Sequence, residues 1–301
     1  AKENLDAGRT LILEYGNEPW NWGFPASLWM RDQGVAKWPN AIAKGESPYI
    51  LAYNWYAYRS AQVCQIVKTQ FGADANRVKC MMNGQAGNSG VSEQMLACPY
   101  AAAELGKPCS QAVDALAIAP YFGLYIGDMA HRATVATWFN EPDGGVNKLF
   151  QEILAEDANG NKVTPPLYNV TKQSNIGGAV EASKSWITTN KAVAAKHNLP
   201  LVAYEGGQHL VMGVGDTDAR WRDLFIAGNR DPRMGKAYTR MMENWKAAGG
   251  QTFTVFNSVS QPSMWGAWGL KEVQFTTESA KWQAVMSYRD TKACWWTGCS
   301  N

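Results

Sequence analysis

Short apolar runs alternate with longer helical patterns along this 301-residue chain, and this alternation most constrains the fold. Each run ends on glycine or polar residues. The runs lie at 10–15, 77–82, 113–121, 199–205 and 252–257. Alternation of this kind is typical of a parallel sheet whose strands are joined by helices. We therefore expect an α/β fold with about five βα units, forming one domain over residues 1–301.

Two of the apolar runs end on a carboxylate. The first continues into Asn17 and Glu18, and Pro19 biases Glu18 toward an extended backbone. A later run ends on Glu205, which is followed by two glycines. The carboxyl ends of parallel strands are where α/β barrels carry their chemistry, and glycoside hydrolysis uses two carboxylates facing one cleft. For Glu18 taken alone, a surface residue in a strand-to-helix loop is an equally good interpretation.

Aromatic residues are the unusual part of the composition, with 14 Trp and 12 Tyr. Many will belong to the core, but flat rings also bind the C–H faces of sugars. Trp20 and Trp22 closely follow Glu18, while Trp265 and Trp268 follow the last apolar run. We expect these four rings to contact a sugar, with core packing as the alternative for Trp265 and Trp268.

Polar side chains near the ends of two runs are further candidates for substrate contacts. Gln85 and Gln208 carry amides suited to sugar hydroxyls, and His209 directly follows Gln208. For Gln85 and Gln208, an ordinary polar loop residue is an equally good interpretation, and for His209 a structural hydrogen bond is. His131 and His197 are expected to be structural.

Several classes of function are disfavoured by what the sequence lacks. A net charge of +2 without a Lys/Arg cluster argues against nucleic-acid binding. No apolar stretch is long enough to predict a membrane span. The three histidines are scattered, so we expect no metal, and no phosphate-binding or serine-hydrolase motif predicts a cofactor or another reaction class.

The six cysteines fall in three neighbourhoods of the sequence. Pairing nearest neighbours predicts the disulfides Cys64–Cys80, Cys98–Cys109 and Cys294–Cys299, one of 15 possible connectivities. Disulfides and the glycosylation sequon at Asn169 predict a secreted protein. Reduced cysteines in a cytosolic protein are the alternative. A long insertion at 124–175 is expected to form a lid or a subsite wall.

The ordered motifs resemble the clan of retaining glycoside hydrolases with (β/α)8 barrels. In that clan an Asn-Glu pair ends the fourth strand and a Glu ends the seventh. More narrowly, the EYGNEPWN of 14–21 is similar to the EYSNEVWN of a poorly characterised branch, often labelled cellulose-binding or glycosidase-like. The AIAPYFG of 117–123 and the YEGGQHL of 204–210 resemble two other motifs of that branch.

This resemblance implies a role for each matching residue. Glu18 would be the acid/base, Glu205 the nucleophile, Asn17 the partner of the sugar 2-hydroxyl, and Tyr121 the group that orients the nucleophile. A direct catalytic role for Glu14, on the same face of the run as Glu18, is a weaker hypothesis. The fold implied is a (β/α)8 TIM-type barrel, of which this chain would supply strands 4 to 8. The first three strands would then be missing or belong to a companion chain.

Together these observations predict a secreted retaining glycoside hydrolase. It would cleave a β-linked polysaccharide or oligosaccharide by double displacement, with no cofactor and no nucleic-acid or membrane partner. The main alternative is a non-catalytic carbohydrate-binding protein on a glycosidase scaffold, as in cellulose binding. A third is an assembly fragment whose function depends on a companion chain.

Overall fold

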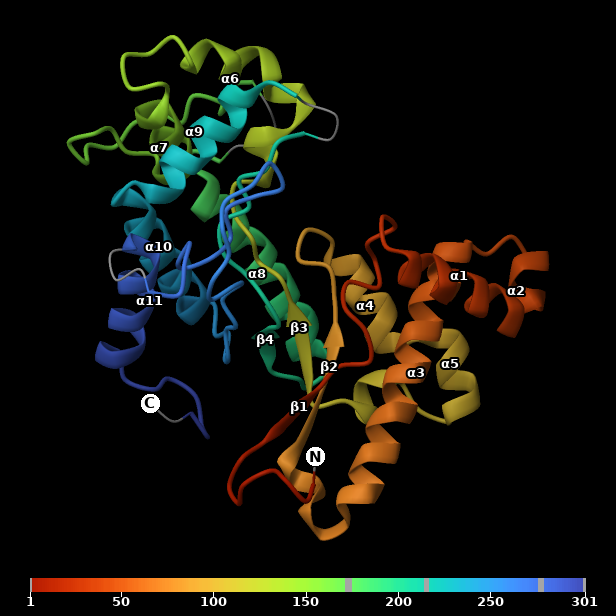
Figure 1. Ribbon diagram of the computed structural model, residues 1–301. Helices are drawn as coiled ribbons and strands as arrows, with labels where there is room; N and C mark the ends of the chain where they lie inside the picture. The colour runs from red at the N-terminus through yellow and green to blue at the C-terminus, as the bar shows by residue number, and fades with distance from the viewer. Residues whose placement is uncertain (1, 171–174, 214–216, 276–278, 300–301) are drawn as a thin grey trace. The chain divides into compact units, whose positions relative to one another are not determined.

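The computed structural model describes residues 2–170, 175–213, 217–275 and 279–299 (Figure 1). The chain divides into two compact units that interleave along the sequence. Unit 1 comprises Ala1–Ala119 and Thr188–Tyr204, and unit 2 comprises Pro120–Ile187 and Glu205–Asn301. The chain passes from one unit to the other at three points, and one of these falls within helix α8 (Ala179–Lys196). Each unit is described by itself.

Unit 1 contains a parallel sheet of four strands in the order β1-β2-β3-β4. The strands are β1 (Leu11–Leu13), β2 (Val78–Asn83), β3 (Ala115–Ile118) and β4 (Leu201–Ala203). Leu11 pairs with Val78, Met81 with Ala115, and Leu116 with Leu201. All four residues of β3 are buried, as expected for a parallel sheet covered on both faces. This confirms the α/β class and the parallel sheet.

The remaining elements of unit 1 are α1 (Pro25–Lys37), α2 (Pro39–Ala43), α3 (Pro48–Phe71), η1 (Gly72–Arg77), α4 (Ser89–Ala97), α5 (Pro99–Leu105), η2 (Cys109–Ala112) and the second half of α8. Helix α3 runs alongside β2 (Figure 1). It begins where the Ser47 side chain accepts a hydrogen bond from the Tyr49 N–H, and it ends at Gly72, whose φ is 58°. The sequence predicts this helix with the same bounds. The alanine-rich pattern of 92–104 predicts a single helix. The structure has two helices there, because Cys98 adopts a left-handed conformation ahead of Pro99.

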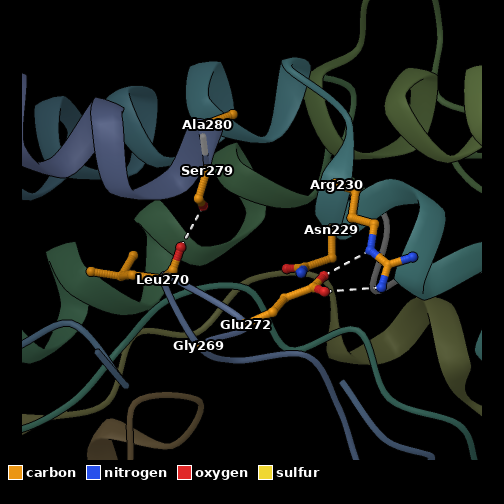
Figure 2. Close-up of a pocket in the computed structure, with 7 residues that line it drawn as sticks. All are labelled: Asn229, Arg230, Gly269, Leu270, Glu272, Ser279 and Ala280. Atoms are coloured by element: carbon orange, nitrogen blue, oxygen red, sulfur yellow. Dashed lines mark hydrogen bonds and ion pairs between the residues drawn. The ribbon is translucent and has the colours of Figure 1, made fainter. Parts of the chain in front are cut away.

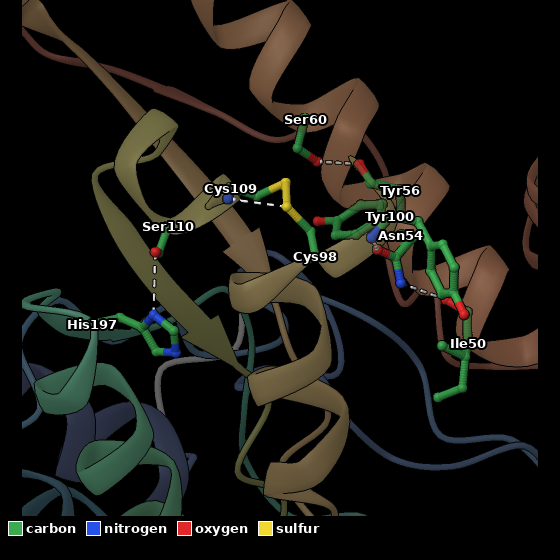
Figure 3. The surroundings of a disulfide bond; sticks show 9 residues. All are labelled: Ile50, Asn54, Tyr56, Ser60, Cys98, Tyr100, Cys109, Ser110 and His197. Carbon is green, nitrogen blue, oxygen red and sulfur yellow. Dashed lines mark hydrogen bonds between the residues drawn. A yellow bond between two sulfur atoms is a disulfide. The ribbon is translucent and has the colours of Figure 1, made fainter. Parts of the chain in front are cut away.

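Three disulfides are present, with the connectivity predicted from the sequence. Cys64–Cys80 joins α3 to β2, and Cys98–Cys109 joins the α4–α5 junction to η2. Figure 3 shows the second bond, where the Cys109 N–H also donates to the Cys98 Sγ at 3.0 Å. These bonds are consistent with a secreted protein.

Polar contacts complete the surroundings of the Cys98–Cys109 bond. The His197 Nδ1 lies 3.1 Å from the Ser110 Oγ, and the Asn54 Oδ1 accepts the Tyr100 N–H at 3.0 Å (Figure 3). His197 is therefore structural, as expected.

Unit 2 is mainly helical. Its elements are η3 (Leu124–Gly127), η4 (Met129–His131), α6 (Arg132–Trp138), α7 (Val146–Leu154), the first half of α8, α9 (Ala219–Arg230), α10 (Arg233–Ala247) and α11 (Ala280–Thr291). Its hydrophobic core includes Trp138 and Phe150, which lie in the predicted insertion at 124–175. The described part of that insertion therefore supplies core as well as surface. Within it Asn169 is exposed, whereas Thr171 of the sequon lies outside the described residues.

The fifth predicted strand, at 252–257, is not formed as a strand in the described residues. The two residues before this run have their backbone carbonyls bound by side chains. The Trp295 indole N–H donates to the Gly250 carbonyl, and the Trp245 indole N–H donates to the Gln251 carbonyl, each at 2.7 Å. The sheet of the described residues thus has four strands, and a closed (β/α)8 barrel is not shown. Among the described helices, none combines the length and apolar character that a membrane crossing requires.

Candidate functional site

Glu18 lies five residues after the end of β1, in the left-handed backbone region with φ of 43°. The extended backbone expected from the following Pro19 is therefore wrong, because the turn after β1 sets the conformation of Glu18. Two contacts hold this turn: the Asn21 N–H donates to the Glu18 carbonyl at 2.9 Å, and the Ser27 hydroxyl donates to it at 3.1 Å. The Asn21 side-chain amide donates to the Glu18 Oε2 at 2.8 Å. The carboxylate is thereby held in one orientation.

The pKa of Glu18 lies above its ordinary value. Burial raises it by disfavouring the charged carboxylate, and the hydrogen bond from Asn21 opposes this by lowering it. Burial is the larger effect. A carboxyl group that keeps its proton to higher pH is suited to general-acid work.

The two tryptophans beside Glu18 have different surroundings. The Trp20 indole N–H donates to the Gly84 carbonyl at 3.2 Å, which ties this ring to the loop after β2. Trp22 packs against Tyr49 and Tyr53 of α3, with ring centroids 4.6 Å and 5.7 Å away. Trp22 therefore belongs to an aromatic cluster with α3.

Other polar residues predicted near this site lie on the sheet edge and its loops. Asn17 is exposed, and Gln85 is half-buried in the turn that its carbonyl closes by accepting the Asn88 N–H. Glu14 is exposed, and its carboxylate accepts a hydrogen bond from the buried Asn83 amide at 3.1 Å. The alternation of side chains along the first run also predicts that Glu14 is a buried barrel carboxylate. That prediction is wrong, because Glu14 is exposed and β1 is a sheet edge in the described residues.

Unit 2 brings three of the predicted residues together. The His209 ring lies edge-to-face against Tyr121 and Trp268, with centroids 5.0 Å and 5.7 Å away. Phe256 lies against Tyr121 and Trp268 at 6.5 Å and 6.1 Å. These four residues form what we call the aromatic box. Burial lowers the pKa of His209 to about 4, so its imidazole is neutral at neutral pH.

Glu205 is half-buried and begins the loop that carries His209. Its two following glycines permit close packing. A Cβ on Gly206 would lie 2.6 Å from the Phe253 ring, and a Cβ on Gly207, whose φ is 153°, would lie 2.8 Å from the Tyr238 hydroxyl. Glu205 belongs to unit 2 and Glu18 to unit 1, so each carboxylate is described with the neighbours of its own unit.

Gln208 connects the two segments that carry His209 and Trp268 of the aromatic box. Its side chain is fully buried, its Nε2 donates to the Ala267 carbonyl at 2.7 Å, and its Oε1 accepts the Leu210 N–H at 2.7 Å. This arrangement favours the structural interpretation of Gln208 over a contact with a sugar hydroxyl.

Lys281 of α11 hydrogen-bonds to the loop that contains Ala267 and Trp268, a role that the sequence did not suggest. The residue is 1% exposed, and its ammonium donates to the carbonyls of Ala267 and Trp268 at 2.8 Å and 3.3 Å. Burial lowers the pKa of Lys281 to about 7, and Glu272 opposes the shift. A lysine in a helix that mixes polar and apolar residues is normally read as exposed. Nothing in the sequence therefore indicated that Lys281 is buried.

Trp265 is placed differently from Trp268, although both lie in one loop. Trp265 is 67% exposed, and its backbone N–H donates to the Ser263 hydroxyl at 3.1 Å. Gly266, with φ of 140°, makes the turn between the two rings, and a Cβ there would lie 2.8 Å from the Trp268 ring. Trp265 is thus free of core packing, whereas Trp268 is partly buried in the aromatic box.

A polar cavity of about 280 Å³ lies behind the loop, next to Gly269 and Leu270 (Figure 2). Arg230 and Glu272 form a two-point ion pair across it, at 2.8 Å and 2.9 Å. The Asn229 Oδ1 is buried without a hydrogen-bond partner among the described residues. The cavity is small and its two charged side chains are paired with each other, so we interpret these residues as structural.

One group of side chains in the described residues has the proximity that a metal site requires: Cys64, Cys80 and Asp114. Both sulfurs are used in a disulfide, so no thiolate remains. The Asp114 carboxylate accepts hydrogen bonds from the Lys68 ammonium at 2.9 Å and the Cys80 N–H at 2.7 Å. These residues do not fit a metal ion.

Comparison of the chain with protein-family models, curated proteins and solved structures finds no match.

Proposed function

We propose that the protein is a secreted retaining glycoside hydrolase with Glu18 as acid/base and Glu205 as nucleophile. The observation that carries the proposal is the environment of Glu18: a partly buried carboxyl group at the carboxyl end of β1, oriented by Asn21, with a raised pKa. The aromatic box that follows Glu205 supports a carbohydrate as the substrate.

In the proposed reaction, the protonated Glu18 gives its proton to the glycosidic oxygen as that bond breaks. The Glu205 carboxylate bonds to the anomeric carbon and forms a glycosyl-enzyme. The ionised Glu18 then takes a proton from water, whose oxygen bonds to the anomeric carbon and releases Glu205. Retention requires the two carboxyl groups to stand about 5–5.5 Å apart during catalysis.

The decisive experiment measures hydrolysis of a panel of aryl β-glycosides by three proteins: the natural chain, Glu18→Gln and Glu205→Gln. We expect each variant to lose activity by about 10²-fold or more. Glu141→Gln, an exposed carboxylate of unit 2, is the matched control. An activated 2-fluoro glycoside should label Glu205 covalently, and peptide mass mapping identifies the labelled residue. Full activity in either active-site variant would refute the assignment.

A second candidate function is carbohydrate binding without turnover, which the exposed ring of Trp265 favours. In this case polysaccharide would retain the protein in affinity electrophoresis, while no glycoside would be hydrolysed and no fluoro glycoside would label it. Trp265→Ala would weaken retention, and Trp38→Ala serves as the control because its indole N–H is bound to Glu104.

A further inference from the structure

Tyr49 lies on the first turn of α3 and is 47% exposed, although its ring is large and aromatic. The Ser47 side chain and Pro48 fix the start of the helix at this point. Because α3 leads into β2, which runs parallel to β1, the start of α3 lies at the end of the sheet where β1 finishes (Figure 1). Tyr49 therefore lies at the same end of unit 1 as Glu18.

Trp22 holds the Tyr49 ring in one orientation. The two ring centroids are 4.6 Å apart, with an angle of 54° between the planes, and Trp22 also lies 5.7 Å from Tyr53. Tyr53 comes four residues after Tyr49, so both project from one face of α3, and Tyr53 is buried. Trp22 is thus fixed against a buried ring and supports the exposed one. An exposed ring that is already ordered loses little conformational entropy when a ligand covers it.

The turn that carries Trp22 also carries Glu18. The Asn21 N–H donates to the Glu18 carbonyl at 2.9 Å, and the Asn21 amide donates to the Glu18 Oε2 at 2.8 Å. The residue before Trp22 therefore holds the carboxyl group. In glycoside hydrolysis the acid gives its proton to the oxygen of the leaving sugar. A sugar that leaves with the proton of Glu18 must lie beside it, next to this turn.

We propose that Tyr49 and Trp22 form the binding site of the leaving sugar, and that this sugar is a neutral pyranose within a chain. This inference rests on the proposed function. The exposed ring of Tyr49 covers the apolar C–H face of the pyranose, and its hydroxyl offers a hydrogen bond at the rim. An acidic sugar would be repelled by the ionised Glu18 in the second half of the reaction. The substrate is thus an oligosaccharide or polysaccharide.

The test follows the release of a trapped glycosyl-enzyme. The full chain is labelled on Glu205 with an activated 2-fluoro glycosyl fluoride, and excess reagent is removed. The methyl β-glycoside of the same sugar is then added as an acceptor. Its hydroxyl gives a proton to Glu18, its oxygen bonds to the anomeric carbon, and the Glu205 carboxylate is released. Mass spectrometry of the intact protein measures how the rate of label loss depends on acceptor concentration.

We expect Tyr49→Ala to raise the acceptor concentration for half-maximal release by about tenfold, because the variant loses the exposed ring. Tyr49→Phe keeps the ring and should stay within about threefold of the natural chain. Labelling by the fluoride, whose leaving group is too small to touch Tyr49, should be affected about fivefold less than release is. Labelling also shows that each variant is folded.

Trp29→Ala is the control for loss of an exposed ring elsewhere in unit 1. Trp29 of α1 is 49% exposed, and its ring packs edge-to-face on Trp55 at 6.2 Å. Trp55 comes six residues after Tyr49, about 120° around α3, so Trp29 covers a different face of that helix. The release curve of Trp29→Ala should match that of the natural chain.

Two kinds of failure are distinguishable. Normal labelling with an unchanged half-maximal acceptor concentration in Tyr49→Ala would overturn this inference and leave the proposed function standing. Release that does not depend on the acceptor in the natural chain would do the same. The absence of any label on Glu205 would overturn the proposed function and this inference together.

Discussion

At the scale of single residues, each unit contains an ionisable side chain that is buried or half-buried and is oriented by hydrogen bonds. Glu18 is oriented by Asn21, and Lys281 is oriented by the carbonyls of Ala267 and Trp268. In each case burial moves the pKa toward the neutral form, because the charged form loses its hydration. The shifted pKa values of Glu18 and Lys281 each lead to a testable prediction.

Asn21→Ala should raise the pKa of Glu18 further, because it removes the hydrogen bond that favours the carboxylate. NMR titration of the Glu18 carboxyl carbon measures this directly, whether or not the protein is an enzyme. If Glu18 is the general acid, the basic limb of the pH profile of kcat/KM should move to higher pH by the same amount. Asn88→Ala is the control, since its side chain caps α4. A lower pKa in Asn21→Ala would contradict the assignment.

Lys281 should make the free energy of unfolding depend on pH. Its pKa is about 7 in the folded chain and near its ordinary value of 10.5 in the unfolded chain. Between these values the unfolded state binds more protons, so the contribution of Lys281 to stability rises with pH from 7 to 10.5. Below pH 7 this gain is absent.

Urea unfolding at pH 7 and pH 9.5 tests the Lys281 prediction. The gain in unfolding free energy between the two pH values should be smaller in Lys281→Met than in the natural chain. Comparing the two proteins cancels the titration of all other groups. Equal gains would show that Lys281 is already neutral, or fully charged, throughout the range.

At the scale of elements, Glu156 connects two parts of unit 2. Its carboxylate is nearly buried and accepts hydrogen bonds from Lys162, Lys236 and Arg240, while Arg240 also donates to the Leu154 carbonyl at the end of α7. Despite the opposing effect of burial, these three cations lower the pKa of Glu156 to about 2. The segment after α7 is thereby attached to α10.

Glu156→Gln should lower the free energy of unfolding by about 2 kcal/mol at pH 7, the usual effect of losing hydrogen bonds to a charged group. The contribution of Glu156 is present above pH 4.5 and is lost as the pH falls from 4.5 toward 2. The difference between Glu156→Gln and the natural chain, measured by denaturant unfolding, should therefore shrink in acid. Glu141→Gln, at an exposed glutamate of unit 2, is the control. A difference that stays constant down to pH 2 would contradict this account.

At the scale of the whole molecule, the described sheet has two edges, and Ile12 of the edge strand β1 is 55% exposed. Exposed edge strands invite pairing with further strands. β1 is therefore the edge at which the companion chain expected from the sequence would add strands.

Native and denaturing mass spectrometry of one preparation tests the companion-chain proposal. We expect a native mass above 33.1 kDa that separates on denaturation into this chain and a second polypeptide. A single species of 33.1 kDa in both spectra would remove the companion chain from the proposal and leave the residue-scale predictions untouched.

The sequence by itself determined the local features of this protein. The helix α3 follows from Ser47, Pro48 and Gly72, whose capping and backbone preferences act over a few residues. The four parallel strands follow from apolar runs, and the disulfide pairs follow from cysteines close in sequence. Each of these depends on short-range chemistry, which a pattern records.

Only the tertiary structure decided the environments of the candidate residues. The 252–257 run has the pattern of a strand, but in the described residues its backbone forms an isolated bridge at Phe253 and a hydrogen bond from the Phe256 N–H to the Gly206 carbonyl, which is short of a strand. Gln208 and Lys281 both support Ala267 from 59 and 14 residues away, and the sequence distinguishes neither from an exposed polar residue. Burial and long-range hydrogen bonds set these roles, and both arise only when distant segments pack together.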